Sequence, residues 1–304
     1  MLWQNKTFEN MDKSKYFLKK PLLIIWFFLF VIFLSVSTGF CKEDWQEQKG
    51  EHFIVYFIRD AAFARDVLDK AEVYYTRIAS GLGYSRYSEF WTWDKRVKIY
   101  IYPNRDSYLR ATGQARWTEG IADYTNKRII SYEWSRGFMD ALLPHEMAHL
   151  IFRDFVGFKG EVPLWLDEGV AQWTEEWKRE AMKAAIKQLL SANSMISLKD
   201  MIKLDVRRVK EGESVKLHSI PDKDGNRKVI VYNAGDLIKT YYIQSVSLVG
   251  FLVERYGSND FTKLCRELRD GKSLEGALRS TYSVYLTSIS DLENKWIRYI
   301  RENY

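Results

Sequence analysis

The feature that most limits how this chain can fold is a pair of histidines, His145 and His149, four residues apart in a strongly apolar segment. The segment from Leu142 to Phe155 is apolar on nearly all sides, which is typical of a buried helix. Residues four apart lie on one face of a helix, so both imidazoles can reach one metal ion. Without such a partner, burying them beside the carboxylate of Glu146 would be costly. The segment therefore predicts a buried helix that carries a metal site.

The pattern H-E-x-x-H also assigns a role to the residue after the first histidine. Glu146 can point at a water on the metal and take its proton, as a general base does. The chain has only four histidines, so this pattern should rarely arise by chance. The alternative is a helix whose two histidines make ordinary hydrogen bonds.

A catalytic zinc site needs a third protein ligand besides the two histidines. Eighteen residues separate His149 from Glu168, which lies in the mostly apolar segment Leu164–Trp173 (LWLDEGVAQW). That interval is long enough for a helix end, a loop and a returning helix, so Glu168 can face the imidazoles. The alternative for Glu168 is an acid on the solvent-exposed side of a helix, but the neighbouring Asp167 fits that description better. Gln172, one turn further on, is a candidate to hydrogen-bond a metal ligand.

These residues resemble the gluzincin zinc peptidases. HEMAH followed after eighteen residues by Glu, inside LWLDEGVAQW, is similar to aminopeptidase-N-like enzymes. The segments 241–257 and 269–278 are similar to small bacterial peptidase-MA-like domains. The resemblance implies a zincin fold like that of thermolysin, with His145, His149 and Glu168 as zinc ligands and Glu146 as general base. It further implies that a tyrosine stabilises the oxyanion, for which Tyr242 matches best and the adjacent Tyr241 is the alternative.

One segment departs from the aminopeptidase pattern. Those enzymes carry Gly-x-Met-Glu-Asn upstream, which clamps the free amine of the substrate. Here the comparable stretch is Gly120-Ile-Ala-Asp-Tyr124, without the Glu-Asn pair. This argues against aminopeptidase specificity. We expect the strand Arg128–Tyr132 to pair instead with an extended peptide along a sheet edge.

The expected function is therefore a zinc-dependent metallopeptidase, a hydrolase that acts on a peptide or protein. The alternative is a catalytically silent, peptidase-like binding or scaffold protein at the membrane. The complete set of His145, Glu146, His149 and Glu168 favours the enzyme. Nucleic acid is not an expected partner, because the net charge of +6 is modest and no nucleic-acid-binding motif accompanies it.

The N-terminus carries the pattern of a membrane segment. Every residue from Leu22 to Leu34 is apolar, no charge lies between Lys20 and Lys42, and four lysines stand at positions 13–20. Basic residues before an apolar run describe a signal peptide or a membrane-spanning helix, with the basic end in the cytoplasm. Both readings stay open: residues 1–41 are cleaved, or residues 21–40 anchor the chain. Either places residues 42–304 outside the cytoplasm, in the periplasm or at the cell surface.

The rest of the chain predicts an α+β fold. A small mixed sheet is expected within about 50–135, followed by active-site helices over 136–190, a hairpin over about 213–233 and C-terminal helices over 236–304. Periodicity places the sheet strands at His52–Ile58, Arg96–Tyr102 and Arg128–Tyr132.

Overall fold

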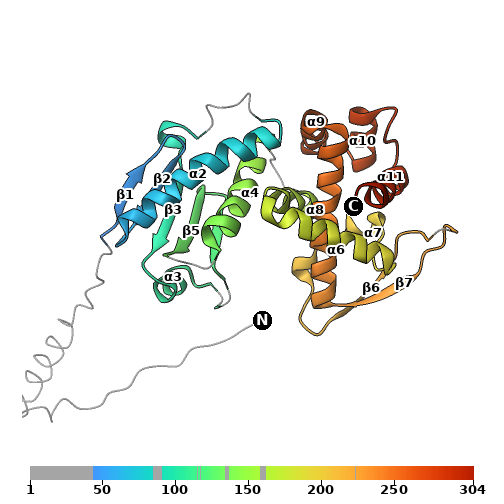
Figure 1. Ribbon diagram of the computed structural model, residues 1–304, viewed down its shortest axis with the longest axis horizontal. Coiled ribbons are helices and arrows are strands. Elements are labelled where there is room, and N and C mark those ends of the chain that lie inside the picture. The colour runs from blue at the N-terminus through green and yellow to red at the C-terminus, as the bar shows by residue number, and fades with distance from the viewer. Residues whose placement is uncertain are drawn as a thin grey trace, which may run out of the picture. The chain divides into compact units, whose positions relative to one another are not determined.

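A mixed five-stranded sheet forms the first half of the protein, in the order β1-β2-β3-β5-β4 (Figure 1). Its central strands β2, β3 and β5 run parallel, and β1 and β4 pair antiparallel at the two edges. The strands are β1 (Gln46–Lys49), β2 (Phe53–Phe57), β3 (Val97–Tyr102), β4 (Gly120–Asp123) and β5 (Arg128–Tyr132). This computed structural model describes residues 44–84, 91–114, 116, 118–133, 137–157, 162–222 and 224–304.

The sheet buries one face against two long helices. Alternate residues of β2 and β3 point inward and are fully or almost fully buried, as the period of two in a strand requires. The helices α2 (Ala61–Gly81) and α4 (Leu143–Val156) pack on this face and against each other (Figure 1). The short helix α3 (Arg105–Thr112) follows β3. This packing fixes α4, which carries both histidines, to the sheet.

The second half is mostly helical. The segment predicted as active-site helices divides into the π-helical turn η3 (Phe138–Leu142), α4, α5 (Leu164–Trp173), the turn η4 (Glu176–Lys178) and α6 (Arg179–Ser191). The later elements are α7 (Leu198–Met201), the hairpin β6 (Ser214–His218) and β7 (Val229–Asn233), α8 (Ala234–Tyr256), α9 (Ser258–Arg269), α10 (Leu274–Tyr282) and α11 (Ile289–Asn303). In Figure 1 the hairpin lies near the start of α8, and α9 and α10 lie near its other end.

Two glycines allow α5 and α8 to cross closely. A Cβ atom on Gly169 of α5 would lie 2.6 Å from the carbonyl oxygen of Ser245 in α8. A Cβ atom on Gly250 of α8 would lie 2.5 Å from Cζ3 of Trp173 at the end of α5. Both separations are shorter than real Cβ contacts. The glycines therefore set how deeply α5, which carries Glu168, sits between α4 and α8.

The α+β class, the small mixed sheet and the mostly helical C-terminal part are as predicted. The strand β5 has the predicted bounds, but one expectation about it is wrong. β5 is bonded to β3 on one side and to β4 on the other, so it cannot offer a free edge to a peptide. The strand at that edge of the sheet is β4, which the sequence pattern did not predict.

The expected signal peptide or anchor, residues 1–41, lies outside the described residues. Within the described ranges, no helix combines the length and the apolar character that crossing a membrane requires.

Candidate metal centre

The side chains of His145, His149 and Glu168 converge between α4 and α5. The Nε2 atoms of the two histidines lie 3.3 Å apart. An oxygen of Glu168, Oε2, lies 3.9 Å from each of these nitrogens. One ligand atom from each residue falls within 4.8 Å of the others. The structure thus brings together all three residues that the sequence singled out as metal ligands.

Local sequence explains why α4 presents its histidines here. Pro144 has no N–H to donate, so it is tolerated only near the start of the helix, directly after the turn η3. His145 and His149 follow one helical turn apart. Gly157, at a φ of 75°, ends the helix in the left-handed conformation that glycine adopts without strain. The chain then returns with Glu168 in the second turn of α5.

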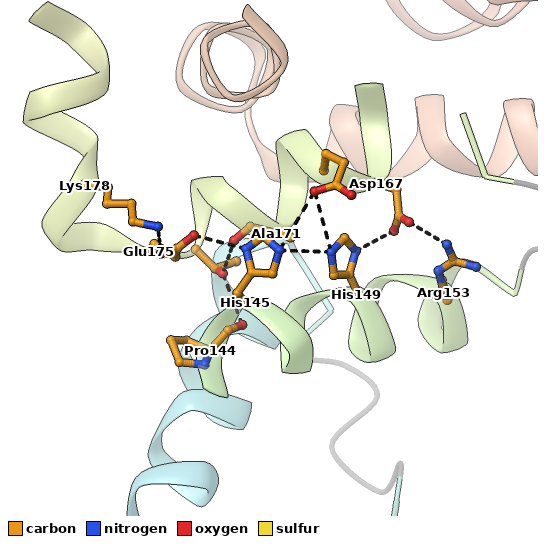
Figure 2. A network of polar contacts seen from close by, with 10 residues as sticks. Pro144, His145, His149, Arg153, Asp167, Ala171, Glu175 and Lys178 are labelled. Atoms are coloured by element: carbon orange, nitrogen blue, oxygen red, sulfur yellow. Dashed lines mark hydrogen bonds and ion pairs between the residues drawn. The ribbon is translucent and has the colours of Figure 1, made fainter. Parts of the chain in front are cut away.

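Each imidazole is held from its other side by a carboxylate (Figure 2). His149 Nδ1 lies 2.9 Å from Oδ1 of Asp167, whose second oxygen accepts a 2.5 Å hydrogen bond from Arg153. His145 Nδ1 lies 3.1 Å from Oε1 of Glu175, which is also paired with Lys178. Asp167 and Glu175 are only 4% and 2% exposed. Both ring orientations are therefore fixed by buried partners.

These carboxylates decide which ring nitrogens carry protons. A carboxylate accepts hydrogen bonds, so it favours the tautomer with the proton on Nδ1. In both histidines this tautomer makes Nε2 the ligand atom, and the two Nε2 atoms face each other, 3.3 Å apart. Two Nε2 atoms this close need a shared proton or a metal ion between them, and a bound metal ion would displace the proton. Two nitrogens bound about 2.0–2.1 Å from one tetrahedral ion would be roughly 3.3–3.4 Å apart, so the spacing fits a bound metal ion.

The charge balance of the centre also fits a divalent cation. Four acids, Glu146, Asp167, Glu168 and Glu175, surround the imidazoles. Within the part of the chain that the structure describes, Arg153 and Lys178 pair with two of them. Burial disfavours a charged His149, but Asp167, Glu168 and Glu146 outweigh it and raise the pKa of His149 to about 9. The acids thus create a negative potential that stabilises positive charge at this position.

Glu146 lies beside the ligands without being one of the three. Burial raises the pKa of its carboxyl; the two histidines lower it, and Glu168 and Asp167 raise it further. Its side chain faces a cleft of about 830 Å³ that is also lined by His145, Gln172 and Tyr242. A carboxylate in this position can exchange a proton with a molecule bound in the cleft.

The two candidate tyrosines differ in placement. Tyr241 is fully buried in the core, whereas Tyr242 lines the cleft beside His145 and Glu146. Burial and the nearby Glu168 raise the pKa of Tyr242 to about 12, so its phenol is protonated at neutral pH. Of the pair, Tyr242 is the one positioned to donate a hydrogen bond into the cleft.

One expectation about a neighbouring residue is wrong. Asp167 is not a solvated helix acid, because it is buried against His149 and Arg153. Sequence reasoning missed Glu175, which bonds His145, whereas Gln172, three positions before it, lines the cleft. Sequence reasoning also missed Tyr124, whose ring lies 5.9 Å from that of His149 and stacks under the guanidinium of Arg153 at 4.3 Å.

No protein-family model matches the chain, and the search of curated proteins finds no significant match.

Proposed function

We propose that this protein is a zinc-dependent metallopeptidase of the gluzincin type. The observation that carries the proposal is the convergence of the two histidine Nε2 atoms, 3.3 Å apart, with the carboxylate of Glu168, beside a cleft that His145 and Glu146 line. Ligands and proton acceptor in one cleft are what metal-assisted hydrolysis requires. The packing of α4 on a mixed sheet, with α5 returning across it, supports assignment to the zincin folds.

Zinc is the proposed metal because its catalytic sites use three nitrogen or oxygen ligands and keep one position open. His145, His149 and Glu168 would hold it. The bound ion would polarise the scissile carbonyl and lower the pKa of the attacking water. Asp167 and Glu175 would keep the imidazoles in the ligand tautomer and orientation.

The remaining chemistry falls to side chains of the cleft. Glu146 accepts the proton of the attacking water on its carboxylate and then delivers it to the leaving amine. The phenol of Tyr242 donates a hydrogen bond to the oxygen that gains negative charge. Its protonated state at neutral pH suits that role.

The substrate is proposed to be an extended peptide that lies along β4. This strand is the last in the sheet order, and its first residue, Gly120, lines the cleft together with His145 and Glu146. A peptide added to a sheet edge is held through its main chain, so its own side chains remain available for selection.

The decisive experiment combines metal analysis with peptide cleavage. Purified protein should contain one zinc ion per chain, and His149→Ala should lose it. Glu146→Gln should keep the metal and reduce hydrolysis of a peptide library by about 10²–10⁴-fold. Zinc bound without cleavage, in wild type and variant alike, would instead support the silent scaffold. Protein that cannot be loaded with metal would refute the site.

We further place residues 42–304 outside the cytoplasm, after a cleaved signal peptide or an anchor formed by residues 21–40. Alkaline phosphatase, which is active only outside the cytoplasm, tests this when fused after Tyr304. An inactive fusion, with a cytoplasmic reporter active at the same junction, would reverse the topology. A high-salt wash then separates the two forms, because only the anchored chain stays with the membranes.

A further inference from the structure

A second cavity lies at the other end of α8 from the metal centre. It has a volume of about 650 Å³ and is formed by the end of α8, the start of α9, the segment that joins α10 to α11, and α11 itself. Phe251 and Arg255 line this cavity, and they follow Tyr242 of the metal cleft by nine and thirteen residues along α8. A helix rises about 1.5 Å per residue, so roughly 14–20 Å of helix separates them. The cavity is therefore a separate candidate site, of a size that suits a small ligand.

The base of the cavity is a cluster of aromatic rings. Phe251 is only 1% exposed, and its ring centroid lies 5.5 Å from that of Tyr256 and 5.2 Å from that of Tyr299. The ring of Tyr285 lies 6.0 Å from that of Tyr256, and this residue is 60% exposed. An apolar group that enters the cavity can pack on these rings and shield Tyr285 from water.

The open ring of Tyr285 is held at the cavity by its own segment of the chain. Lys295, which lines the cavity, donates a hydrogen bond to the carbonyl oxygen of Tyr285 and pairs with Asp291 at 3.3 Å. Ser283, two residues before Tyr285, has a φ of 29°, in the left-handed region that residues other than glycine rarely adopt. Such a backbone persists only where surrounding contacts hold it, so the segment between α10 and α11 keeps Tyr285 in place at a local cost.

Charged side chains of both signs also line the cavity. Two are positive, Arg255 and Arg298, and two are negative, Asp260 and Glu302. Glu302 follows Arg298 by four residues on α11, a spacing at which opposite charges often pair. Yet none of these four side chains takes part in a hydrogen bond or an ion pair within the described residues. Both pairs of charges are therefore available to a ligand.

These charges restrict the chemistry of the ligand. Arginine binds a carboxylate through parallel N–H···O bonds, and a carboxylate side chain accepts hydrogen bonds from an ammonium group. A purely anionic ligand would face Asp260 and Glu302, and a purely cationic one would face Arg255 and Arg298. A zwitterion satisfies both pairs, and the aromatic base suits a ligand that also carries a ring.

We infer that this cavity binds a zwitterion with an aromatic side chain, either a free amino acid or a dipeptide. The inference goes beyond the proposed peptidase function and does not depend on it, because the cavity shares no lining residue with the metal cleft.

The test uses three probes that differ by one charge at a time. Phenylalanine carries both charges, N-acetyl-phenylalanine lacks the ammonium group, and phenylalaninamide lacks the carboxylate. Each is titrated calorimetrically into the full chain, stripped of metal with EDTA and dialysed, so that no metal ion can chelate the probes. We expect phenylalanine to bind about tenfold or more tightly than either derivative, since each loses its charge-assisted hydrogen bonds. The dipeptide alanylphenylalanine, whose charges lie further apart, identifies the better of the two ligands.

Substitutions on α11 assign the two charges. Arg298→Gln should remove most of the preference for phenylalanine over its amide, and Glu302→Gln most of the preference over the N-acetyl derivative. Arg301→Gln, an exposed arginine of α11 that does not line the cavity, is the matched control and should bind all probes as wild type does. Equal binding of the three probes, or an equal effect of Arg298→Gln and Arg301→Gln, would overturn the inference.

The aromatic part is tested in the same way. Tyr285→Ala should weaken the binding of phenylalanine about fivefold. Val284→Ala changes a neighbour that is 82% exposed and does not line the cavity, and it should have no effect. Zinc added back to the stripped protein should leave all these affinities unchanged. Binding that appears only with zinc would belong to the metal centre and overturn the inference, whereas zinc-independent binding stands even if no peptide is cleaved.

Discussion

Asp167 Oδ1 lies 2.9 Å from His149 Nδ1, on the side of the ring away from the converging ligand atoms. The same carboxylate is held by Arg153, and its pKa reflects this environment. Burial alone would raise the pKa of Asp167, but His149 and Arg153 outweigh it and lower the pKa below its ordinary value. The acid is therefore ionised at neutral pH and accepts a hydrogen bond from Nδ1–H, which makes Nε2 the atom that would bind a metal ion.

Asp167→Asn should weaken zinc binding about 10–100-fold while leaving the fold intact. An amide can present its NH₂ group to Nδ1, which removes the preference for the ligand tautomer. Competition with a chromophoric chelator measures the affinity. Glu180→Gln, an exposed acid of α6, is the matched control and should bind zinc as wild type does. An affinity for Asp167→Asn that equals the control would contradict the role given to this contact.

Gly169→Ala should destabilise the protein and weaken zinc binding together. The added methyl group would meet Ser245 and Val249 of α8 at 2.6 Å, so α5 must shift and take Glu168 with it. Overpacking of this kind typically costs about 1–3 kcal/mol of unfolding free energy. Urea denaturation and zinc titration measure the two effects.

Gly235→Ala is the control for that substitution. Gly235 lies in the first turn of α8, and its added Cβ would have only an ordinary contact, 3.6 Å from Oδ1 of Asn233. Alanine is favoured over glycine in a helix, so this variant should be neutral or slightly more stable. Equal loss of stability in both variants would show that the close crossing of α5 and α8 is not the cause.

Acid should remove a contribution to stability that comes from Glu72 of α2. Its carboxylate accepts hydrogen bonds from His52, at 2.9 Å from the backbone nitrogen and 2.7 Å from Nδ1. Partial burial would raise the pKa of Glu72, but the bonds from His52 outweigh it and lower the pKa below its ordinary 4.5. A carboxyl with a lowered folded-state pKa stabilises the fold above its unfolded pKa, and this is lost as the pH falls through its folded pKa.

Glu72→Gln therefore should cost about 1–3 kcal/mol near neutral pH and progressively less below pH 4.5. Urea unfolding of both proteins between pH 7 and pH 3 gives the difference directly. A difference that stays constant with pH would assign the effect to lost packing and not to the charge.

The sequence predicted the parts of the site that depend on local geometry. His145 and His149 share a face because they are four residues apart on one helix, and no tertiary information is needed for that. The role of Asp167 could not be read in the same way. Asp167 and Glu168 are neighbours on α5, and which of them turns inward depends on how Gly169 packs against α8. Both residues turn inward: the carboxylate of Asp167 contacts Nδ1 of His149, and the carboxylate of Glu168 faces Nε2 of the same ring.

The edge strands were missed for a related reason. β1 (QEQK) and β4 (GIAD) are four residues long and carry no apolar alternation. Their structure comes from hydrogen bonds to β2 and β5, which are themselves found easily because their alternate residues are buried. An edge strand with little to bury leaves almost no periodic pattern in the sequence. For this reason the predicted substrate edge fell on β5, one strand too far inside.

Substituting the two adjacent tyrosines of α8 should separate a catalytic phenol from a structural one. Tyr242→Phe removes a hydrogen-bond donor that lines the cleft beside His145 and Glu146. Loss of one donor to a developing oxyanion typically lowers kcat by about 10²–10³-fold. Zinc affinity and KM should change little, because the donor acts on charge that forms only in the transition state. Tyr241→Phe removes the same atom from a fully buried side chain and should leave kcat near the wild-type value. A reversed result, with kcat lost only in Tyr241→Phe, would move the oxyanion donor to the buried residue and require a different arrangement of α8 in the active enzyme.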